Sequence, residues 1–150
     1  WGDYPYVTSS HCTTAGALLN AIPPSWVRDV WGVGKVYETY SGFKNFEPPH
    51  PHFPKIRELG EEYGATTGRP RQCNWLDLTR LVRAIKINGV NQVVLNKVDV
   101  LRSLGVYRLI KEGAHVGFHS FNDMRQYIEK ELSTVDPEIK LHFSERKDAI

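Results

Sequence analysis

The residues between Gly64 and Arg71 combine side chains that suit the binding of a small, oxygen-rich anion. The segment reads Gly64-Ala65-Thr66-Thr67-Gly68-Arg69-Pro70-Arg71. The glycines permit close backbone approaches, and the threonine hydroxyls both donate and accept hydrogen bonds. Arg69 and Arg71 present planar guanidinium groups that bind carboxylate or phosphate through paired hydrogen bonds, and Pro70 fixes one backbone angle between them. We interpret the segment as a candidate anion-binding loop. The alternative is a helix C-cap at Gly64 followed by a solvated basic turn.

A second polar group, Asn96-Lys97-Val98-Asp99, directly follows the apolar residues 92–95. In doubly wound sheets, ligands bind at the carboxyl ends of strands. Asp99 can accept hydrogen bonds from the two adjacent N–H groups of guanine, a pair that adenine lacks. The stem of Lys97 can lie over the purine face, and Asn96 can tie the loop together. The alternative is that Asp99 only caps a helix beginning at Val100.

Two further groups of side chains have weaker claims to a function. Hydroxyl residues crowd the N-terminal part of the chain, at Thr8, Ser9, Ser10, Thr13 and Thr14. Hydroxyls ahead of a helix N-terminus can bind phosphate, but the local sequence favours a plain N-cap for a helix at 15–19. His50 and His52 could ligate a metal, but the sequence offers no third ligand nearby.

Composition excludes several classes of protein. The chain has 150 residues, 41% apolar and 24% charged, with a net charge of +2, which is ordinary for one soluble domain and does not indicate a nucleic-acid binder. No stretch of 18 apolar residues suggests a membrane span. Cys12 and Cys73 fit no metal-binding spacing, and we expect a reduced, cytoplasmic setting, with a disulfide left open. The chain starts at Trp1 without a methionine, so we expect it to be a fragment.

The pattern of apolar residues predicts alternating helices and strands around these groups. We expect helices at 15–19, 54–63, 75–88 and 121–132, a helical turn at 26–30, and strands at 33–40, 92–95, 106–110 and 139–143. Gly64 is the expected C′ residue of the second helix, while Asn74 and Gly89 bound the third, and Ser120 caps the last. A helix followed closely by a buried strand is half of a βαβ unit. The predicted fold class is therefore α/β, with part of a mainly parallel twisted sheet and flanking helices.

Three segments taken together resemble the adenylosuccinate synthetase family. Residues 4–16 resemble its YPYVTSS…TTAG segment, residues 64–77 its GxTTGRPRRxxWLD segment, and residues 96–101 its TKLDVL segment, here with Asn96 in place of threonine. The resemblance implies a P-loop-NTPase-like fold, of which this chain lacks the N-terminal phosphate-loop half. It also implies that the chain is the C-terminal portion of an enzyme that condenses IMP with L-aspartate, using GTP and Mg²⁺.

Site residues follow from the resemblance by position. Thr8 and Arg69 would contact IMP, and residues Ala65 to Arg71 would form the aspartate loop. Arg71, Lys97, Val98 and Asp99 would bind GTP. The resemblance further implies a homodimer and no nucleic-acid or membrane partner.

The chain departs from the family pattern in three places. The catalytic aspartate and histidine of the family, with the segments expected to bind Mg²⁺, lie in N-terminal glycine-rich segments that nothing here matches. We therefore expect no catalytic or metal residue in this chain, and no activity from the chain alone. The RVGxGPFPT segment is replaced around Tyr40–Phe43, and the STGP segment is absent near Leu141–Ser144. The guanine preference is correspondingly less constrained.

Three alternatives remain open from the sequence. The chain could belong to the viral relative that uses dGMP in place of IMP. It could belong to a guanine-nucleotide-binding module without catalysis. A small metal protein that uses His50 and His52 is the third alternative.

Overall fold

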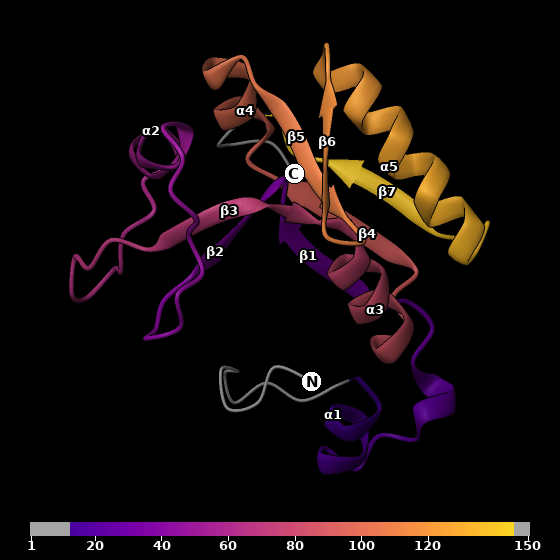
Figure 1. Cartoon of the computed structure of the whole chain (residues 1–150). Coiled ribbons are helices and arrows are strands. Elements are labelled where there is room, and N and C mark those ends of the chain that lie inside the picture. The colour runs from indigo at the N-terminus through magenta and orange to yellow at the C-terminus, as the bar shows by residue number, and fades with distance from the viewer. Residues whose placement is uncertain (1–12, 146–150) are drawn as a thin grey trace.

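Residues 13–145 are described by the structure, a computed structural model of the chain. Their strands form two sheets, between which the chain passes back and forth (Figure 1). The first sheet has the order β1-β4-β7 and is parallel throughout, whereas the second, β2-β3-β5-β6, has only its central pair parallel. The strands are β1 (Trp31–Lys35), β2 (Tyr37–Tyr40), β3 (Gln72–Asp77), β4 (Gln92–Asn96), β5 (Tyr107–Lys111), β6 (Ala114–Phe118) and β7 (Lys140–Phe143). The α/β class is confirmed.

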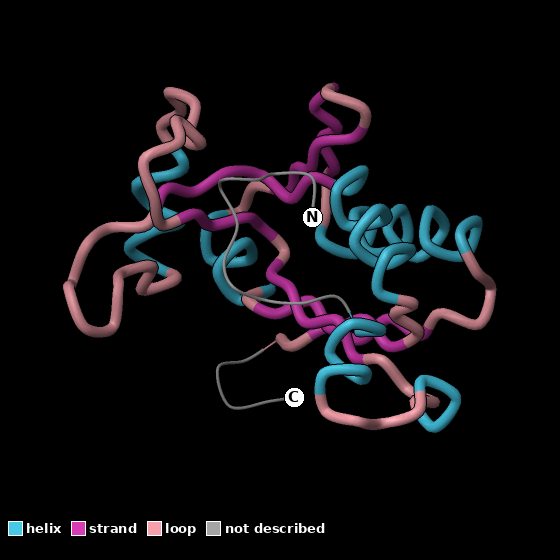
Figure 2. Tube along the Cα trace, turned by 90° about the horizontal axis from the view of Figure 1, so that it is seen from below, coloured by secondary structure: helices cyan, strands magenta, loops and turns pink. Residues whose placement is uncertain are grey.

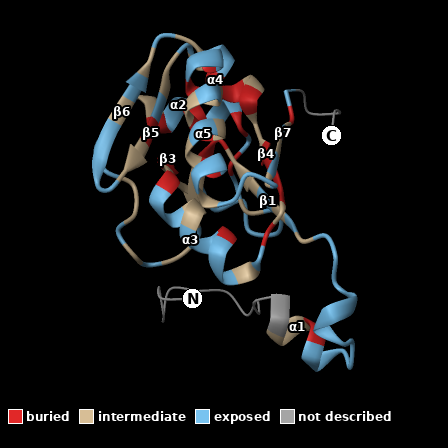
Figure 3. Cartoon of the chain, turned by 90° about the vertical axis from the view of Figure 1, so that its right-hand side faces the viewer, coloured by how far each residue is buried: buried red, intermediate tan, exposed pale blue. Residues whose placement is uncertain are grey.

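The helices are distributed around these sheets. They are α1 (Thr13–Leu19), the 3₁₀-helix η1 (Pro24–Trp26), α2 (His52–Leu59), α3 (Leu78–Asn88), α4 (Val98–Leu104) and α5 (Phe121–Val135). The helices α3 and α5 pack against each other and against β5, while α2 packs on β3 and α4. The first two helical segments, α1 and η1, lie apart from the sheets (Figures 1 and 3). Within residues 13–145, none of these helices has the length and apolar character needed to cross a bilayer.

One hydrophobic core holds the two sheets and their helices together. Its fully buried members include Leu95 of β4, Leu101 of α4, Leu109 of β5 and Met124 of α5. Figure 3 shows the buried residues on the strands and on the inner faces of the helices. Because β4 is buried along its length and its carboxyl end leads into α4, the segment after it is held by the core on both sides.

The last helix and the end of α3 agree closely with the sequence prediction. Ser120 accepts a hydrogen bond from the backbone of Asp123, whose side chain accepts one from Ser120 in return, so α5 begins with a capping box. The buried residues of α5 are Phe121, Met124, Ile128 and Leu132. Gly89 ends α3 in the left-handed conformation, with φ of 62°.

The predicted start of α3 at Trp75 is wrong. Residues 72–77 form β3, and Asp77, not Asn74, caps the helix by accepting hydrogen bonds from Thr79 and Arg80. Trp75 lies opposite Tyr37 of β2, and Leu76 opposite Leu109 of β5. Pairing on both sides of β3 therefore outweighs the helical spacing of the apolar residues that follow it.

The predicted single strand at 33–40 is also wrong, since it is two strands in different sheets. Val36 alone separates β1 from β2; it is fully buried, and its N–H donates to Asn96 O at 3.0 Å. An uninterrupted run of apolar and aromatic residues does not show where a chain changes sheets. The turn expected at 26–30 lies earlier, at η1, because prolines occupy the position before it and its first residue.

The second predicted helix ends earlier than expected. Helix α2 ends at Leu59 with Gly60 as its C-cap, so Gly64 is not the C′ residue, and Leu59 and Tyr63 are 47% and 44% exposed instead of buried. Glu61 adopts φ of 53° and turns the chain, which sends Glu62 inward. The connections 41–51 and 60–71, on either side of α2, consequently lie on the same side of the molecule, at the left of Figures 1 and 2.

Candidate functional site

The predicted anion loop is a closed excursion between α2 and β3. Tyr63 and Pro70 form an antiparallel bridge at its base, and Gly64 N–H donates to Arg69 O at 2.9 Å. Gly68 N–H donates to Gly64 O at 2.8 Å, and Gly68 takes φ of 62°, a conformation that favours glycine. Residues 65–70 are all exposed. The backbone therefore fixes the ends of the loop and presents its hydroxyls and Arg69 to solvent.

The two arginines of the loop are held very differently. Arg69 is exposed, and its backbone N–H donates to Thr67 Oγ1 at 3.3 Å. Arg71, at the root of the loop, lies with its Nη1 3.2 Å from Glu62 Oε2, and its side chain is 35% exposed. The Arg71 backbone is fixed too, since its carbonyl accepts from Arg57 Nε at 2.7 Å. Arg71 is thus an oriented cation, and Arg69 a cation on an exposed tip.

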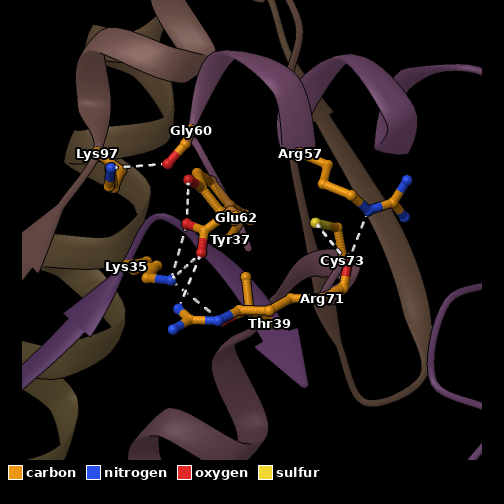
Figure 4. A network of polar contacts seen from close by, with 9 residues as sticks. All are labelled: Lys35, Tyr37, Thr39, Arg57, Gly60, Glu62, Arg71, Cys73 and Lys97. Atoms are coloured by element: carbon orange, nitrogen blue, oxygen red, sulfur yellow. Dashed lines mark hydrogen bonds and ion pairs between the residues drawn. The ribbon is translucent and has the colours of Figure 1, made fainter. Parts of the chain in front are cut away.

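Glu62 is the centre of the polar network that holds Arg71 (Figure 4). Its side chain is 2% exposed, and Lys35 Nζ lies 2.8 Å from its Oε1 and 2.7 Å from its Oε2. The hydroxyl of Tyr37 donates to Oε1 at 2.7 Å. Lys35 also donates to Thr39 Oγ1 at 3.1 Å, and it lines a cavity of about 550 Å³ between β1, β2 and α3. The network therefore connects the anion loop with this cavity.

The charges in the network set the protonation of its members. Burial alone would raise the pKa of Glu62, but hydrogen bonds from Lys35 and Tyr37, and the charges of Lys35 and Lys97, bring it below its ordinary value of 4.5. Burial, together with the hydrogen bond to Glu62, raises the pKa of Tyr37 above its ordinary value of 10. Glu62 is therefore a carboxylate and Tyr37 a neutral donor at neutral pH.

The residues after β4 lie at the start of α4. Lys97 is the N-cap residue, with a left-handed backbone at φ of 69°, and its Nζ donates to Gly60 O at 2.9 Å. Val98 is fully buried, and Asp99 is half-buried within the first turn of the helix. The alternative that Asp99 serves as the N-cap is wrong. An acidic side chain in this position interacts favourably with the helix dipole in any case.

Gly60 brings the two predicted polar groups into one region. Its carbonyl binds Lys97, and it stands two residues before Glu62, which binds Arg71. Asp99 lies two residues after Lys97, in the first turn of α4. Arg69 takes no part in it, and Thr8 lies outside the described residues.

Lys35, Tyr37 and Glu62 are the polar residues that the sequence analysis missed. Glu62 was included in a predicted helix, where an acidic side chain is unremarkable. The available signal was Lys35, Tyr37 and Thr39, at every second position, a spacing that would place a lysine, a phenol and a hydroxyl on one side of the strand predicted at 33–40. That spacing does not identify the partner of the lysine, which lies 27 residues away.

The connection 41–47, which follows β2, is held by hydrogen bonds to β3. Gln72 Oε1 accepts from the N–H groups of Phe46 and Glu47, at 2.8 and 3.1 Å, and its Nε2 donates to Lys44 O at 2.7 Å. Asn74 Nδ2 donates to Phe46 O at 3.1 Å. Gln72 and Asn74 thus fix this connection against β3.

His50, His52 and Cys73 pack against neighbouring side chains of the fold. His50 and His52 lie with their rings 4.9 Å apart and pack edge-on against Trp75. Within residues 13–145, no cluster of three or more His, Cys, Asp or Glu side chains is arranged to hold a metal ion. Cys73 is a free, buried thiol whose pKa burial raises to about 11.

Comparisons with known proteins identify relatives. A family model described as adenylosuccinate synthetase matches residues 1–137. The chain is 45% identical over 107 residues to an adenylosuccinate synthetase of Halothermothrix orenii, covering 69% of this chain and 25% of that protein. It is 42% identical over 121 residues to one of Brugia malayi, covering 75% of this chain and 28% of that protein.

A solved structure supports the same relationship. The fully ligated adenylosuccinate synthetase from Plasmodium falciparum superposes with a TM-score of 0.69 and 27% identity, covering 93% of this chain and 42% of that one. The chain spans about a quarter of the length of the curated relatives it matches.

Proposed function

The chain belongs to the adenylosuccinate synthetase family, and on this premise we propose that it supplies the aspartate loop and the guanine pocket of a ligase that makes adenylosuccinate. The reaction joins IMP and L-aspartate through a C–N bond at the expense of GTP. The observation that carries this proposal is Arg71, an oriented cation at the root of an exposed glycine–threonine loop. An anion that enters the loop meets a guanidinium that is already in place.

Aspartate is the substrate that the loop suits best. Arg71 binds one of its carboxylates, and Arg69 closes on the other from the exposed tip, with Thr67 as a further donor. Arg69 also contacts the IMP ribose, and Thr8 the IMP phosphate. One guanidinium fixed in advance lowers the entropy lost on binding, whereas the exposed one allows the loop to adapt.

GTP binds on the α4 side of the network. Asp99 accepts the two N–H groups of guanine, the stem of Lys97 covers the base beside Val98, and Arg71 approaches the phosphates. Support comes from the hydrogen bond between Lys97 and Gly60, which places this segment next to the root of the aspartate loop. The 6-oxygen of IMP receives the phosphoryl group of GTP, and the aspartate amine then displaces phosphate.

The remaining machinery is assigned to other parts of the protein. We place the catalytic aspartate and histidine, and the ligands of Mg²⁺, outside this chain, and expect a homodimer. The chain alone is accordingly expected to be inactive, and adenylosuccinate formation by purified residues 1–150 would contradict this.

The decisive experiment is an assay of the intact protein with IMP, aspartate and GTP, which follows adenylosuccinate formation. We expect activity that requires all three substrates and Mg²⁺. Replacing IMP by dGMP in the same assay tests the viral-type reaction. Activity with dGMP, aspartate and GTP, but not with IMP, would identify dGMP as the nucleotide substrate in place of IMP.

Calorimetric titration separates the enzyme from a non-catalytic nucleotide-binding module. For the enzyme, aspartate or its analogue hadacidin binds measurably only when IMP and GTP are present. Nucleotide binding that is independent of aspartate, together with an inactive assay, would reject the proposed function.

A further inference from the structure

Glu62 has no role in the reaction as proposed above, yet it makes more polar contacts than any ligand-binding residue assigned there. Each of its two oxygens accepts two hydrogen bonds: Oε1 from Lys35 and Tyr37, at 2.8 and 2.7 Å, and Oε2 from Lys35 and Arg71, at 2.7 and 3.2 Å. The four contacts use the lone-pair directions of a carboxylate completely. The plane of this carboxylate, and with it the direction of Arg71 Nη1, is therefore fixed.

Burial prevents Glu62 from contacting a ligand directly. Its side chain is 2% exposed, whereas those of Lys35 and Arg71 are 26% and 35% exposed. The two cations thus stand between the carboxylate and the solvent. Arg71 donates one N–H group, on Nη1, to Glu62. Among the contacts of residues 13–145, this is the one hydrogen bond of its guanidinium, so the other N–H groups can bind an incoming anion.

Charge balance favours an anionic ligand at this place. One carboxylate facing two cations leaves a net charge of +1 among Lys35, Glu62 and Arg71. A second negative group next to Arg71 would complete the neutralisation. Without Glu62, the two cations would repel each other and would have no common reference for their orientation.

We propose that Glu62 is a positioning residue: its buried carboxylate holds the Arg71 guanidinium and the Lys35 ammonium ready for a carboxylate-bearing substrate. Lys35 lines the 550 Å³ cavity and Arg71 closes the root of the loop, so Glu62 sets the relation between the two. The proposal rests on the proposed function for the identity of the substrate, aspartate. The orientation of Arg71 by Glu62 does not depend on which anion binds.

The test uses the intact protein with the substitution Glu62→Gln, which keeps the size of the side chain and removes its charge. We expect the aspartate KM to rise about 10-fold or more, since a buried charged partner is lost, while kcat changes by about 2-fold or less. The matched control is Tyr37→Phe, which removes one hydrogen bond to the same carboxylate and no charge. It should lower the melting temperature as Glu62→Gln does, but leave the aspartate KM within about 2-fold.

A second measurement tests the role of Glu62 without requiring enzymatic activity. Nitrogen-15 NMR of the arginine side chains, with Arg71 assigned by Arg71→Lys, reports rotation of its guanidinium. We expect separate Nη signals for Arg71 in the wild type and in Tyr37→Phe, and averaged signals in Glu62→Gln.

The possible results divide cleanly. An inactive wild type would reject the proposed function, and the NMR measurement would still decide the role of Glu62. Separate Arg71 signals in Glu62→Gln, an unchanged aspartate KM in an active Glu62→Gln enzyme, or an equal rise of KM in Tyr37→Phe, would each overturn the positioning role.

Discussion

Arg71 and Arg69 have the same side chain and flank the same proline, but the fold treats them as different groups. Arg71 is fixed by a buried carboxylate and by a hydrogen bond to its own carbonyl, whereas Arg69 lies on an exposed tip. The sequence pattern predicted two equivalent guanidinium forks. At the residue scale, the environment that orients a charge decides its contribution, because a preoriented group loses less entropy when it binds.

Replacing Arg71 by leucine in the intact protein tests this difference. We expect Arg71→Leu to weaken the use of aspartate by on the order of 2 kcal/mol in kcat/KM, the lower end of the range for charged partners because the side chain is 35% exposed. Arg83→Leu, on the exposed face of α3, is the control and should leave the kinetics unchanged. Steady-state kinetics with varied aspartate measure both; an unaltered aspartate KM and kcat in Arg71→Leu would count against the assignment.

In the proposed function, the preference for guanine depends on Asp99. In the intact protein, Asp99→Asn should reduce the preference for GTP over ITP and ATP, since an amide offers one acceptor where guanine presents two donors. We expect a loss of about 1–3 kcal/mol in discrimination, as for an unpaired buried donor. Competition between nucleoside triphosphates in the assay measures it, and unaltered selectivity would remove Asp99 from the pocket.

At the scale of elements, the sequence predicted those helix ends that depend on interactions between neighbouring residues. The cap at Ser120 and the end of α3 at Gly89 depend on neighbours within a few residues, and both are confirmed. Trp75 lies in a strand because Tyr37 pairs with it, 38 positions earlier. No window of sequence around Trp75 contains that partner, which is why the start of α3 was misplaced.

The candidate site follows the same rule. The exposed loop at 64–71 was recognisable from its glycines, threonines and arginines, which are contiguous in the chain. Its anchor was not, because Glu62 is bound by Lys35 and Tyr37, 27 and 25 residues away. The sequence thus predicted a candidate anion-binding loop, and the fold shows that Arg71 is the arginine of this loop that a buried carboxylate orients.

Gly60 is the point where α2 ends, and its small size is essential to that ending. An added Cβ would collide with the Tyr37 hydroxyl and lie 2.9 Å from Ile56 O. Because Tyr37 is buried and bonded to Glu62, it cannot move aside. We expect Gly60→Ala to lower the free energy of unfolding by about 1–3 kcal/mol, measured by urea denaturation.

The control for this substitution is Gly117→Ala in β6, where an added Cβ meets nothing within 4 Å. It should change the free energy of unfolding by less than about 0.5 kcal/mol. Equal effects of the two alanines would show that the contact with Tyr37 is unimportant.

At the scale of the whole molecule, stability should depend on pH through His52. Burial, and then the charges of His50, Lys55 and Arg108, lower its pKa below the ordinary value of 6.5. The unfolded chain therefore takes up the proton first, so the stability contributed by neutral His52 is present above pH 6.5 and is lost as the pH falls through the lowered value. Thermal melts across this range should show a decline that is smaller in His52→Gln; identical slopes would exclude His52 as the source.

The single buried residue between β1 and β2 has a mechanical consequence for the molecule. Lys35 is the last residue of β1 in one sheet, and Tyr37 is the first residue of β2 in the other. Both side chains donate hydrogen bonds to Glu62. Any change in the dihedral angle between the sheets would pull one of these donors away from the carboxylate. One buried carboxylate therefore connects the two sheets at the place where the chain passes from one to the other.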